Sequence, residues 1–380
     1  MPERVLITGG AGFVGSHLAD ALSAAGHEVT LFDNLEPQVH GALAEGARPA
    51  YLDPRHRLVV GDVRDPVALG ALVRDTEVVF HLAAMVGVGQ SMYQVRRYTD
   101  VNAMGMATLL ETLVTQRRQL RLRKLLVASS MSIYGEGAYE CPRCGHVAPG
   151  LRSTEQLASG AWEVRCPTCE AEASPVPTNE DKPLLPSSIY AITKRDHEEM
   201  ALAFAQAYDV PAVALRFFNI YGSRRALSNP YTGVAAIFSG RILAGQPPVV
   251  FEDGRQLRDF VHVSDVVQAC LLAMNDPAAD NQALNVGSGH PVSVLEVAET
   301  LAETLAWTGG LDVRQQFRAG DIRHCFADLD RVRRLLGYEP RYRFLDGVRE
   351  LVGWVAEQQG VADDRLPEAA RELAAHGLVR

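Results

Sequence analysis

The chain has 380 residues, a formal net charge of −9 and 47% apolar residues. This length allows one large α/β domain or a large domain with a smaller one, and the acidic balance argues against a binder of nucleic acid or of an anionic membrane. Because no apolar run approaches the roughly 20 residues of a membrane span, and a strand begins too early to leave room for a signal peptide, we expect a cytoplasmic protein.

The first part of the chain alternates short apolar runs with amphipathic stretches, a rhythm typical of a parallel sheet covered by helices. The predicted strands are Val5–Thr8, Val29–Phe32, Leu58–Val60, Val78–Leu82 and Leu125–Ser129, and the predicted helices are Ser16–Ala25, Pro66–Arg74 and Asn102–Gln116. We therefore expect residues 1–135 to form a Rossmann-type core with a doubly wound parallel sheet.

A glycine-rich turn follows the first strand and precedes the first helix; it reads Thr8-Gly9-Gly10-Ala11-Gly12-Phe13-Val14-Gly15. Its glycines meet three needs: a tight turn, close approach of backbone N–H groups to a pyrophosphate, and close packing of helix on strand. The helix N-terminus adds unpaired donors for the anion. A turn that only packs a helix is the alternative, but the strand before it and the helix after it favour a dinucleotide.

Two acidic residues refine this prediction. Asp33, beside Asn34, ends the second strand, where a carboxylate would accept hydrogen bonds from the adenosine ribose and repel a 2′-phosphate. The site is therefore predicted to bind NAD rather than NADP. Asp62-Val63 follows the third strand, and Asp62 is equally well interpreted as an adenine contact or as a carboxylate that caps its own turn.

Three side chains that can assist the oxidation of an alcohol occur in the middle of the chain. The fifth strand ends in a serine-rich stretch that includes Ser130, and Tyr190 and Lys194 lie four residues apart on a predicted helix, Tyr190–Tyr208. A nearby ammonium lowers the pKa of a phenol, so that Tyr190 can act as a base. A Tyr-x-x-x-Lys pair is weak evidence by itself, but after a dinucleotide motif it indicates removal of an alcohol proton while hydride leaves for the nicotinamide.

Four of the six cysteines form two Cys-x-x-Cys pairs in residues 136–186, between Ser130 and Tyr190: Cys141, Cys144, Cys166 and Cys169. Two such knuckles complete a tetrahedral site of four sulfur ligands, which predicts a structural zinc in a ribbon-like insertion, with iron as the competing metal. Trp162–Arg165 suits a short strand of this ribbon. Its place in the chain suggests a position near the substrate pocket and a role as its cover.

The remaining segments return to the core and then form a smaller lobe. Residues 187–219 carry the Tyr/Lys helix and a strand, Ala212–Phe218, and residues 220–356 are expected to form mainly a separate substrate lobe. Residues 357–380 are expected to form a tail with one helix. The elements predicted in these last two regions are the strands Val249–Phe251, Asp259–His262 and Gln282–Val286 and the helices Ser264–Met274, Ser293–Leu305 and Pro367–Gly377.

These motifs together resemble the extended short-chain dehydrogenase/reductases, and within them the NAD-dependent nucleotide-sugar epimerases and dehydratases. The resemblance covers nearly the whole chain except the cysteine insertion and the tail. Its motifs are the glycine turn, His81-Leu82-Ala83-Ala84, Asn102 with Gly105, Ser130, Tyr190, Lys194, Arg216-Phe217-Phe218-Asn219, Arg258-Asp259-Phe260-Val261-His262 and Arg318-Ala319-Gly320-Asp321.

The family pattern, carried over by position, implies roles for individual residues. Ser130, Tyr190 and Lys194 would be catalytic, and Lys194 would also hold the nicotinamide ribose. The residues expected to bind NAD tightly are Gly9, Gly12, Phe13, Val14, Gly15, Asp33, Asn34, Asp62, Val63, Leu82, Ala83, Ala84, Asn102, Tyr190 and Lys194. The residues expected to bind a nucleotide-diphosphate sugar are Met85, Val86, Ser130, Met131, Ser132, Tyr190, Phe218, Asn219, Asn229, Arg258, Arg318 and Asp321. Arginines suit a diphosphate because they offer forked donors, although each alone could be a solvated surface charge.

The reaction expected from this pattern is 4-epimerisation through a transient 4-keto sugar. Dehydratases of the family carry an Asp-Glu pair where this chain has Met131 and Ser132, so 4,6-dehydration is unsupported. Segments 87–93, 129–139 and 228–238 resemble dTDP-L-rhamnose 4-epimerase-like proteins, and Met85, Val86, Met131 and Phe218 would suit the methyl group of a 6-deoxy sugar. A 4-epimerase of UDP-glucose or UDP-glucuronate is the alternative, and a non-catalytic dinucleotide sensor is disfavoured by the intact catalytic set. A homodimer through the helices 102–116 and 190–208 is expected by analogy.

Overall fold

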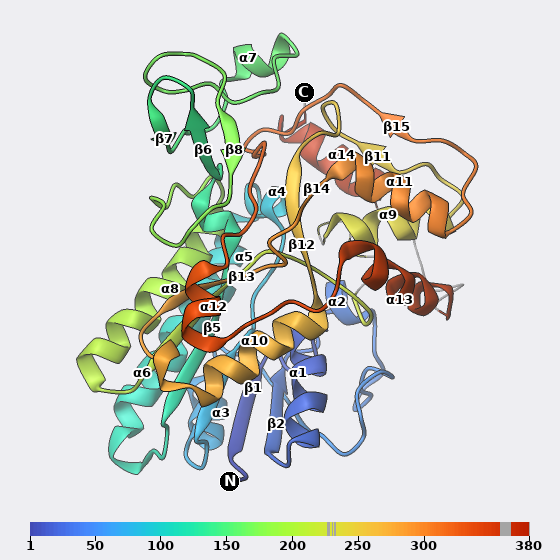
Figure 1. Cartoon of the computed structure of the whole chain (residues 1–380). Helices are drawn as coiled ribbons and strands as arrows, with labels where there is room; N and C mark the ends of the chain where they lie inside the picture. The colour runs from blue at the N-terminus through green and yellow to red at the C-terminus, as the bar shows by residue number, and fades with distance from the viewer. Residues whose placement is uncertain (226–228, 230, 232, 358–365, 380) are drawn as a thin grey trace.

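A central sheet of seven parallel strands organises the structure, a computed structural model that describes residues 1–225, 229, 231, 233–357 and 366–379 (Figure 1). The strand order is β13-β9-β5-β4-β1-β2-β3, so the chain reverses direction of travel across the sheet after β3. The predicted Rossmann-type α/β fold is confirmed. The strands are β1 (Arg4–Thr8), β2 (Glu28–Asp33), β3 (Arg57–Val60), β4 (Val78–His81), β5 (Lys124–Ser130), β9 (Ala212–Phe217) and β13 (Ala283–Val286).

Helices cover both faces of this sheet and so bury its central strands on both sides. Side chains alternate along a strand, so Val5 and Ile7 of β1 pack with one layer and Leu6 with the other. The first layer contains α1 (Phe13–Ala24) and α10 (Val263–Asn275), and the second contains α3 (Pro66–Val73), α6 (Gly105–Gln116) and α8 (Ile189–Tyr208).

The seventh strand corrects one prediction. Residues 282–286 were expected in a separate lobe, but β13 pairs in parallel with β9 at the edge of the main sheet, with Ala283 opposite Ala214 and Val286 opposite Phe217. The helix before it, α10, likewise packs on α1 in the core layer. Leu284 and Val286 are fully buried there, so the burial of their apolar side chains stabilises this short strand in the main sheet.

The smaller lobe follows β9 and has its own core, which includes Tyr221, Phe238, Phe260 and Leu301. Its two small sheets have the orders β10-β12-β14 and β11-β15. The elements that belong to the lobe or follow it are β10 (Asn219–Tyr221), α9 (Val234–Leu243), β11 (Val249–Val250), β12 (Leu257–His262), β14 (Pro291–Ser293), α11 (Val294–Thr304), β15 (Asp312–Val313), α12 (Asp330–Leu336), α13 (Phe344–Glu357) and α14 (Leu366–Ala375).

Short helical elements fill several connections. The helix predicted from Asn102 begins instead with a π-helical turn, Thr99–Met104, and becomes α6 only at Gly105. The others are α2 (Pro37–His40), α4 (Val88–Ser91), α5 (Val95–Tyr98) and the 3₁₀ turns Arg117–Gln119, Met131–Tyr134 and Pro277–Ala279. No helix in the described ranges is both long and apolar enough to cross a membrane.

The cysteine insertion forms a small antiparallel sheet of its own, in the order β7-β6-β8, and projects from one end of the molecule (Figure 1). Its elements are β6 (Ala138–Cys141), β7 (Gly145–Val147), α7 (Thr154–Ala158) and β8 (Ser174–Val176). The strand predicted at Trp162–Arg165 is wrong, because only Arg165 is paired there, as an isolated bridge to Glu172. A core of three side chains, Tyr139, Val164 and Ala173, holds the insertion together.

The tail folds back over the body of the protein. Residues 358–365 of the predicted tail lie outside the described residues, and the helix α14 begins at Leu366. The carboxylate of Glu372 accepts hydrogen bonds from the hydroxyls of Tyr93 (2.6 Å) and Tyr231 (2.7 Å). After the helix, the backbone N–H of Ala319 donates to the carbonyl of Leu378 (2.9 Å), which joins the end of the chain to the turn at 318–321.

A buried ion pair fixes α8 against the sheet. Arg216 of β9 donates to both oxygens of Glu198, at 2.5 and 3.0 Å, and the hydroxyl of Ser129 on β5 donates to the same carboxylate at 2.8 Å. The guanidinium also donates to the hydroxyl of Tyr134 (2.8 Å). Such a network stabilises a unique arrangement because every buried charge is paired.

We expect Glu198→Gln to lower the free energy of unfolding by about 3–5 kcal/mol, because it leaves the buried guanidinium of Arg216 without a counter-charge. The matched control is Glu199→Gln on the next residue, whose exposed pair with Arg195 contributes less than about 1 kcal/mol. Urea denaturation followed by circular dichroism measures both. Equal stability of the two variants would show that the pair does not hold the helix.

Candidate functional site

The glycine turn has the close contacts that a dinucleotide site requires. Gly9 has a φ of +69°, and a Cβ there would lie 2.7 Å from the backbone nitrogen of Ala83. A Cβ on Gly15 would lie 2.4 Å from the carbonyl oxygen of Gly9. A larger residue at either position would push the turn away from β4 or from its own helix, so both positions require glycine.

Asp33 holds the turn from the end of β2. Its carboxylate accepts hydrogen bonds from the backbone N–H of Ala11 (3.0 Å) and of Leu35 (2.9 Å). The side chain is 8% exposed, so the carboxylate lies beneath the turn and close to the position predicted for a ribose. The two backbone donors fix the position of the Asp33 carboxylate, which is compatible with its recognition of hydroxyl groups.

Asp62 uses its carboxylate locally. It accepts from the backbone N–H (2.9 Å) and guanidinium (2.7 Å) of Arg64, and Asn34 donates to it at 3.5 Å. The Arg64 hydrogen bond lowers the pKa of Asp62 to about 2. Of the two interpretations offered by the sequence, the turn-capping bond is present in the structure. Val63 beside it is buried against Gly105.

Asn102 stabilises the loop after β4 instead of leaving its amide free. Its Oδ1 accepts from the backbone N–H of Met85 (2.8 Å), and its Nδ2 donates to the carbonyl of Met85 (3.1 Å) and to the hydroxyl of Thr193 (2.9 Å). The amide is fully buried. It therefore ties the segment that contains Leu82, Ala83 and Ala84 to the helix of Tyr190.

The structure brings Ser130 and Tyr190 together. Ser130 ends β5, and its hydroxyl oxygen accepts from the backbone N–H (3.2 Å) and hydroxyl (2.9 Å) of Ser132. Tyr190 lies in the first turn of α8, where Ser188 caps the helix by accepting from the N–H of Ala191 (3.1 Å). Helix α8 packs on β5, and the neighbouring Ser130 lowers the pKa of Tyr190, so the two side chains lie near each other.

The source of positive charge near Tyr190 differs from the prediction. Burial raises the pKa of Tyr190, and Ser130 and the guanidinium of Arg225 oppose this rise. Lys194 instead donates to the carbonyl of Ala128 (3.0 Å), and burial lowers its pKa to about 7. The cation that acts on the pKa of Tyr190 in the structure is therefore Arg225, and not Lys194 as expected.

Sequence reasoning missed Arg225. Its guanidinium donates to the carbonyl of Ile220 (2.6 Å) and lies 5.2 Å from the ring centre of Phe13 in the glycine turn. Burial lowers its pKa to about 10, and its Nε has no hydrogen-bond partner among the described residues. Nothing in the Arg224-Arg225 sequence marks the second arginine as buried.

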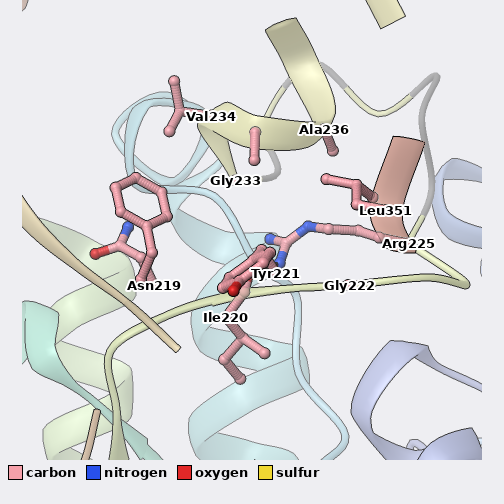
Figure 2. A pocket seen from close by; sticks show the side chains of 11 residues that line it. Asn219, Ile220, Tyr221, Gly222, Arg225, Gly233, Val234, Ala236 and Leu351 are labelled. Carbon is pink, nitrogen blue, oxygen red and sulfur yellow. Dashed lines mark hydrogen bonds between the residues drawn. The ribbon is translucent and has the colours of Figure 1, made fainter. Parts of the chain in front are cut away.

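Arg225 crosses a small cavity of about 10 Å³ between β10 and α9. Figure 2 shows its guanidinium between Tyr221 on one side and Gly233 and Ala236 on the other. Asn219 lines the same cavity, and its buried Oδ1 has no hydrogen-bond partner among the described residues. A buried cation near Phe13 and Tyr190 therefore lines the same cavity as an amide oxygen that has no partner among the described residues.

The predicted sugar-lining residues divide into two groups. Met85, Met131 and Phe218 are buried, at 7%, 9% and 4% exposure, whereas Val86 is 42% exposed. Asn229 is buried and accepts from Gln38 (3.3 Å) and from the backbone N–H of Tyr231 (3.1 Å).

The predicted diphosphate residues come from two segments of the smaller lobe. Arg258, on β12, donates to the carbonyls of Leu257 (2.9 Å), Ile322 (2.7 Å) and Arg323 (2.8 Å). Arg318 pairs with Asp321 at 2.7 Å and stacks on Phe251. Asp321, which was expected to face the diphosphate, accepts hydrogen bonds from the guanidinium of Arg318.

The four cysteines of the insertion converge on one point. The ligand atoms of Cys141, Cys144, Cys166 and Cys169 all lie within 4.8 Å of one another, and all four are free thiols. The sulfurs of Cys141 and Cys169 are 3.5 Å apart. Sulfurs that bind one tetrahedral zinc at about 2.3 Å lie about 3.8 Å from each other, so the cluster fits such a metal.

Comparisons with known proteins agree with this geometry. The NAD dependent epimerase/dehydratase family matches residues 5–150 and 166–287. A "dTDP-L-rhamnose 4-epimerase" of Burkholderia thailandensis is 34% identical over 363 residues, which cover 94% of this chain and 96% of that protein.

Solved structures agree as well. The crystal structure of UDP-glucose 4-epimerase with UDP-glucose from Thermotoga maritima has a TM-score of 0.75 and 28% identity, over 93% of this chain and 99% of that one. A structure of MoeE5 in complex with UDP-glucuronic acid and NAD has a TM-score of 0.72 and 29% identity over the same shares. The chain belongs to the NAD-dependent epimerase/dehydratase family, within the extended short-chain dehydrogenase/reductases.

Proposed function

We propose that the protein is an NAD-dependent 4-epimerase of a nucleotide-diphosphate sugar. The observation that carries this proposal is the packing of α8, which contains Tyr190, on β5, which ends at Ser130, with no carboxylate at positions 131 and 132. Dehydration across C5–C6 would need an acid and a base there. An alcohol oxidised and reduced again at one carbon needs only a phenol and a hydroxyl to move its proton.

In this mechanism Tyr190 removes the proton of the C4 hydroxyl, and Ser130 holds the same oxygen. NAD, held by the turn at 9–15 with Asp33 near its ribose, supplies a hydride acceptor and donor. The 4-keto sugar turns within the pocket while Arg258 and Arg318 hold its diphosphate. Tyr190 then returns the proton to the C4 oxygen, with hydride from the bound cofactor going to the opposite face of C4, and the phenol is ready for another turnover.

The sugar that we propose is L-rhamnose linked to dTDP, or a related 6-deoxy sugar. Support comes from the buried apolar group of Met85, Met131 and Phe218, which suits a methyl substituent. The similarity to the Burkholderia relative points the same way.

Arg225 favours a second candidate, a UDP-glucuronate 4-epimerase. A sugar carboxylate needs a cation, and Arg225 is a buried guanidinium close to Tyr190 with an unused Nε donor. The MoeE5 structure bound to UDP-glucuronic acid shows that a fold of this kind accommodates a uronate.

Incubation with dTDP-L-rhamnose, UDP-glucuronate and UDP-glucose, followed by proton NMR of the products, tests the proposal. We expect the C4 epimer of one of them, and Tyr190→Phe to lower kcat by about 10²–10⁴-fold, because the base is lost. Tyr208→Phe, at the other end of the same helix, should retain activity. No epimer from any sugar, with Tyr190→Phe indistinguishable from the wild type, would contradict the assignment.

Arg225→Met tests the origin of the charge near Tyr190. The guanidinium lowers the pKa of Tyr190, so its removal raises that pKa, and the rise of kcat with pH should move to higher pH. The control is Arg224→Met on the preceding residue, whose guanidinium pairs with Asp20 at 2.6 Å. A selective increase in KM for UDP-glucuronate would identify the carboxylate site, and an unchanged pH profile would rule out an electrostatic role.

We also propose that the four cysteines bind a structural zinc. The support is the closeness of their sulfurs and the small size of the insertion's hydrophobic cluster, which consists of Tyr139, Val164 and Ala173. Four protein ligands would leave no open coordination position, so the metal would not take part in the reaction.

Elemental analysis of purified protein should find about one zinc per chain, and Cys141→Ser with Cys144→Ser should lose it because half of the ligands are gone. Cys270→Ala, a buried cysteine outside the cluster, should retain it. Chelation should lower the unfolding temperature of the wild type. Iron in place of zinc would change the metal assignment, and full stability without any metal would refute a structural role.

A further inference from the structure

A buried cluster of charges lies between the cysteine insertion and the smaller lobe, outside the catalytic set. The insertion contributes Glu136, Arg152 and Glu163, and the lobe contributes Glu252, Asp253, Arg323 and His324. The side chain of Arg323 is 0% exposed, and those of Arg152 and Glu252 are each 2% exposed. Groups this deeply buried require exact partners, so the cluster fixes the geometry of both segments.

Arg323 is the centre of this cluster. Its guanidinium donates to Glu163 (2.6 Å), to Asp253 (2.7 Å) and to Glu252 (3.0 Å). The second oxygen of Glu163 lies 3.0 Å from Nε2 of His324. One carboxylate of the insertion therefore holds two consecutive side chains of the segment that follows Asp321.

The backbone of the same segment holds Arg258. The carbonyls of Ile322 and Arg323 accept from its guanidinium, and Nδ1 of His324 accepts from the backbone N–H of Leu257 (3.1 Å), next to Arg258 on β12. The guanidinium of Arg258 also donates to the carbonyl of Leu257. Among the described residues, these bonds use three of its five N–H groups and leave two to bind an anion.

A second connection reaches the turn that contains Arg318. Arg152 of the insertion donates to both oxygens of Glu252, each at 2.9 Å, and to the backbone carbonyl of Asp321 at 3.3 Å. Asp321 in turn holds Arg318. Both arginines proposed to bind the diphosphate are thus supported by contacts that originate in the insertion.

Glu163 transmits the fold of the insertion to these contacts. It lies three residues before Cys166, and its neighbour Val164 is in the small core with Tyr139 and Ala173. The backbone of Val164 accepts from the N–H of Ala173 (3.0 Å), and Cys166 donates to Ala171 (2.8 Å). The position of the Glu163 carboxylate therefore depends on the folded cysteine knuckles.

We propose that the cysteine insertion positions the diphosphate-binding arginines Arg258 and Arg318 through Glu163 and Arg152, and so sets the affinity for the nucleotide part of the substrate. This inference rests on the proposed function. Glu163 and Arg152 are positioning residues, because they act through the segment 321–324 and not on the reacting atoms. Their loss should raise KM and leave kcat and NAD binding unchanged.

The test measures the binding of dTDP and UDP to the holoenzyme by calorimetry, together with KM, kcat, bound NAD and metal content. Glu163→Gln keeps the shape of the side chain and removes its charge, and we expect roughly tenfold weaker binding and a similar rise in KM. The matched control is Glu172→Gln, an exposed glutamate of the same insertion, which should match the wild type.

Arg152→Lys keeps the charge opposite Glu252 but removes the fork that also reaches Asp321, so it should weaken binding less. If Glu163→Gln loses its metal, the nucleotide binding of Arg152→Lys decides between the outcomes of the test. Unchanged nucleotide binding in a variant that retains its metal would overturn this proposal alone. Failure of the wild type to bind either nucleotide would overturn it together with the proposed function, and a fall in kcat without a change in KM would contradict the positioning role.

Discussion

The arrangement of the active site depends on the carboxylate of Glu198. It is buried under the carboxyl ends of β5 and β9, where a lone charge would be strongly disfavoured, and Arg216 and Ser129 satisfy it. That requirement fixes the rotation and height of α8 against the sheet. Ser129 binds the carboxylate, and the next residue in β5, Ser130, lies near Tyr190, so the structural serine and the reactive serine are adjacent on one strand.

Local patterns in the sequence predicted the features that arise from local physics. The glycine turn, the strand and helix of each βα unit, the Tyr190 and Lys194 spacing and the two cysteine knuckles each depend on residues close together in the chain. Asp33 was predicted correctly at the carboxyl end of its strand. The carboxyl ends of parallel strands all lie at one edge of the sheet, where ligands bind.

The features that the sequence did not reveal depend on partners far away in the chain. β13 joins the main sheet only because β9 presents a free edge beside it. Arg225 differs from Arg224 in burial alone, and burial is decided by α9 and the glycine turn. Lys194 binds the carbonyl of Ala128 because that carbonyl is the nearest acceptor in the folded protein.

The tail has a practical consequence for work with this protein. Glu372 binds Tyr93 and Tyr231, and the backbone of Leu378 pairs with Ala319 beside Arg318. An affinity tag fused at this end of the chain would therefore disturb a segment that is paired with the turn at 318–321, and its effect could be mistaken for a ligand effect in binding assays. Met1 is fully exposed at the opposite end of the molecule (Figure 1), so purification handles belong there.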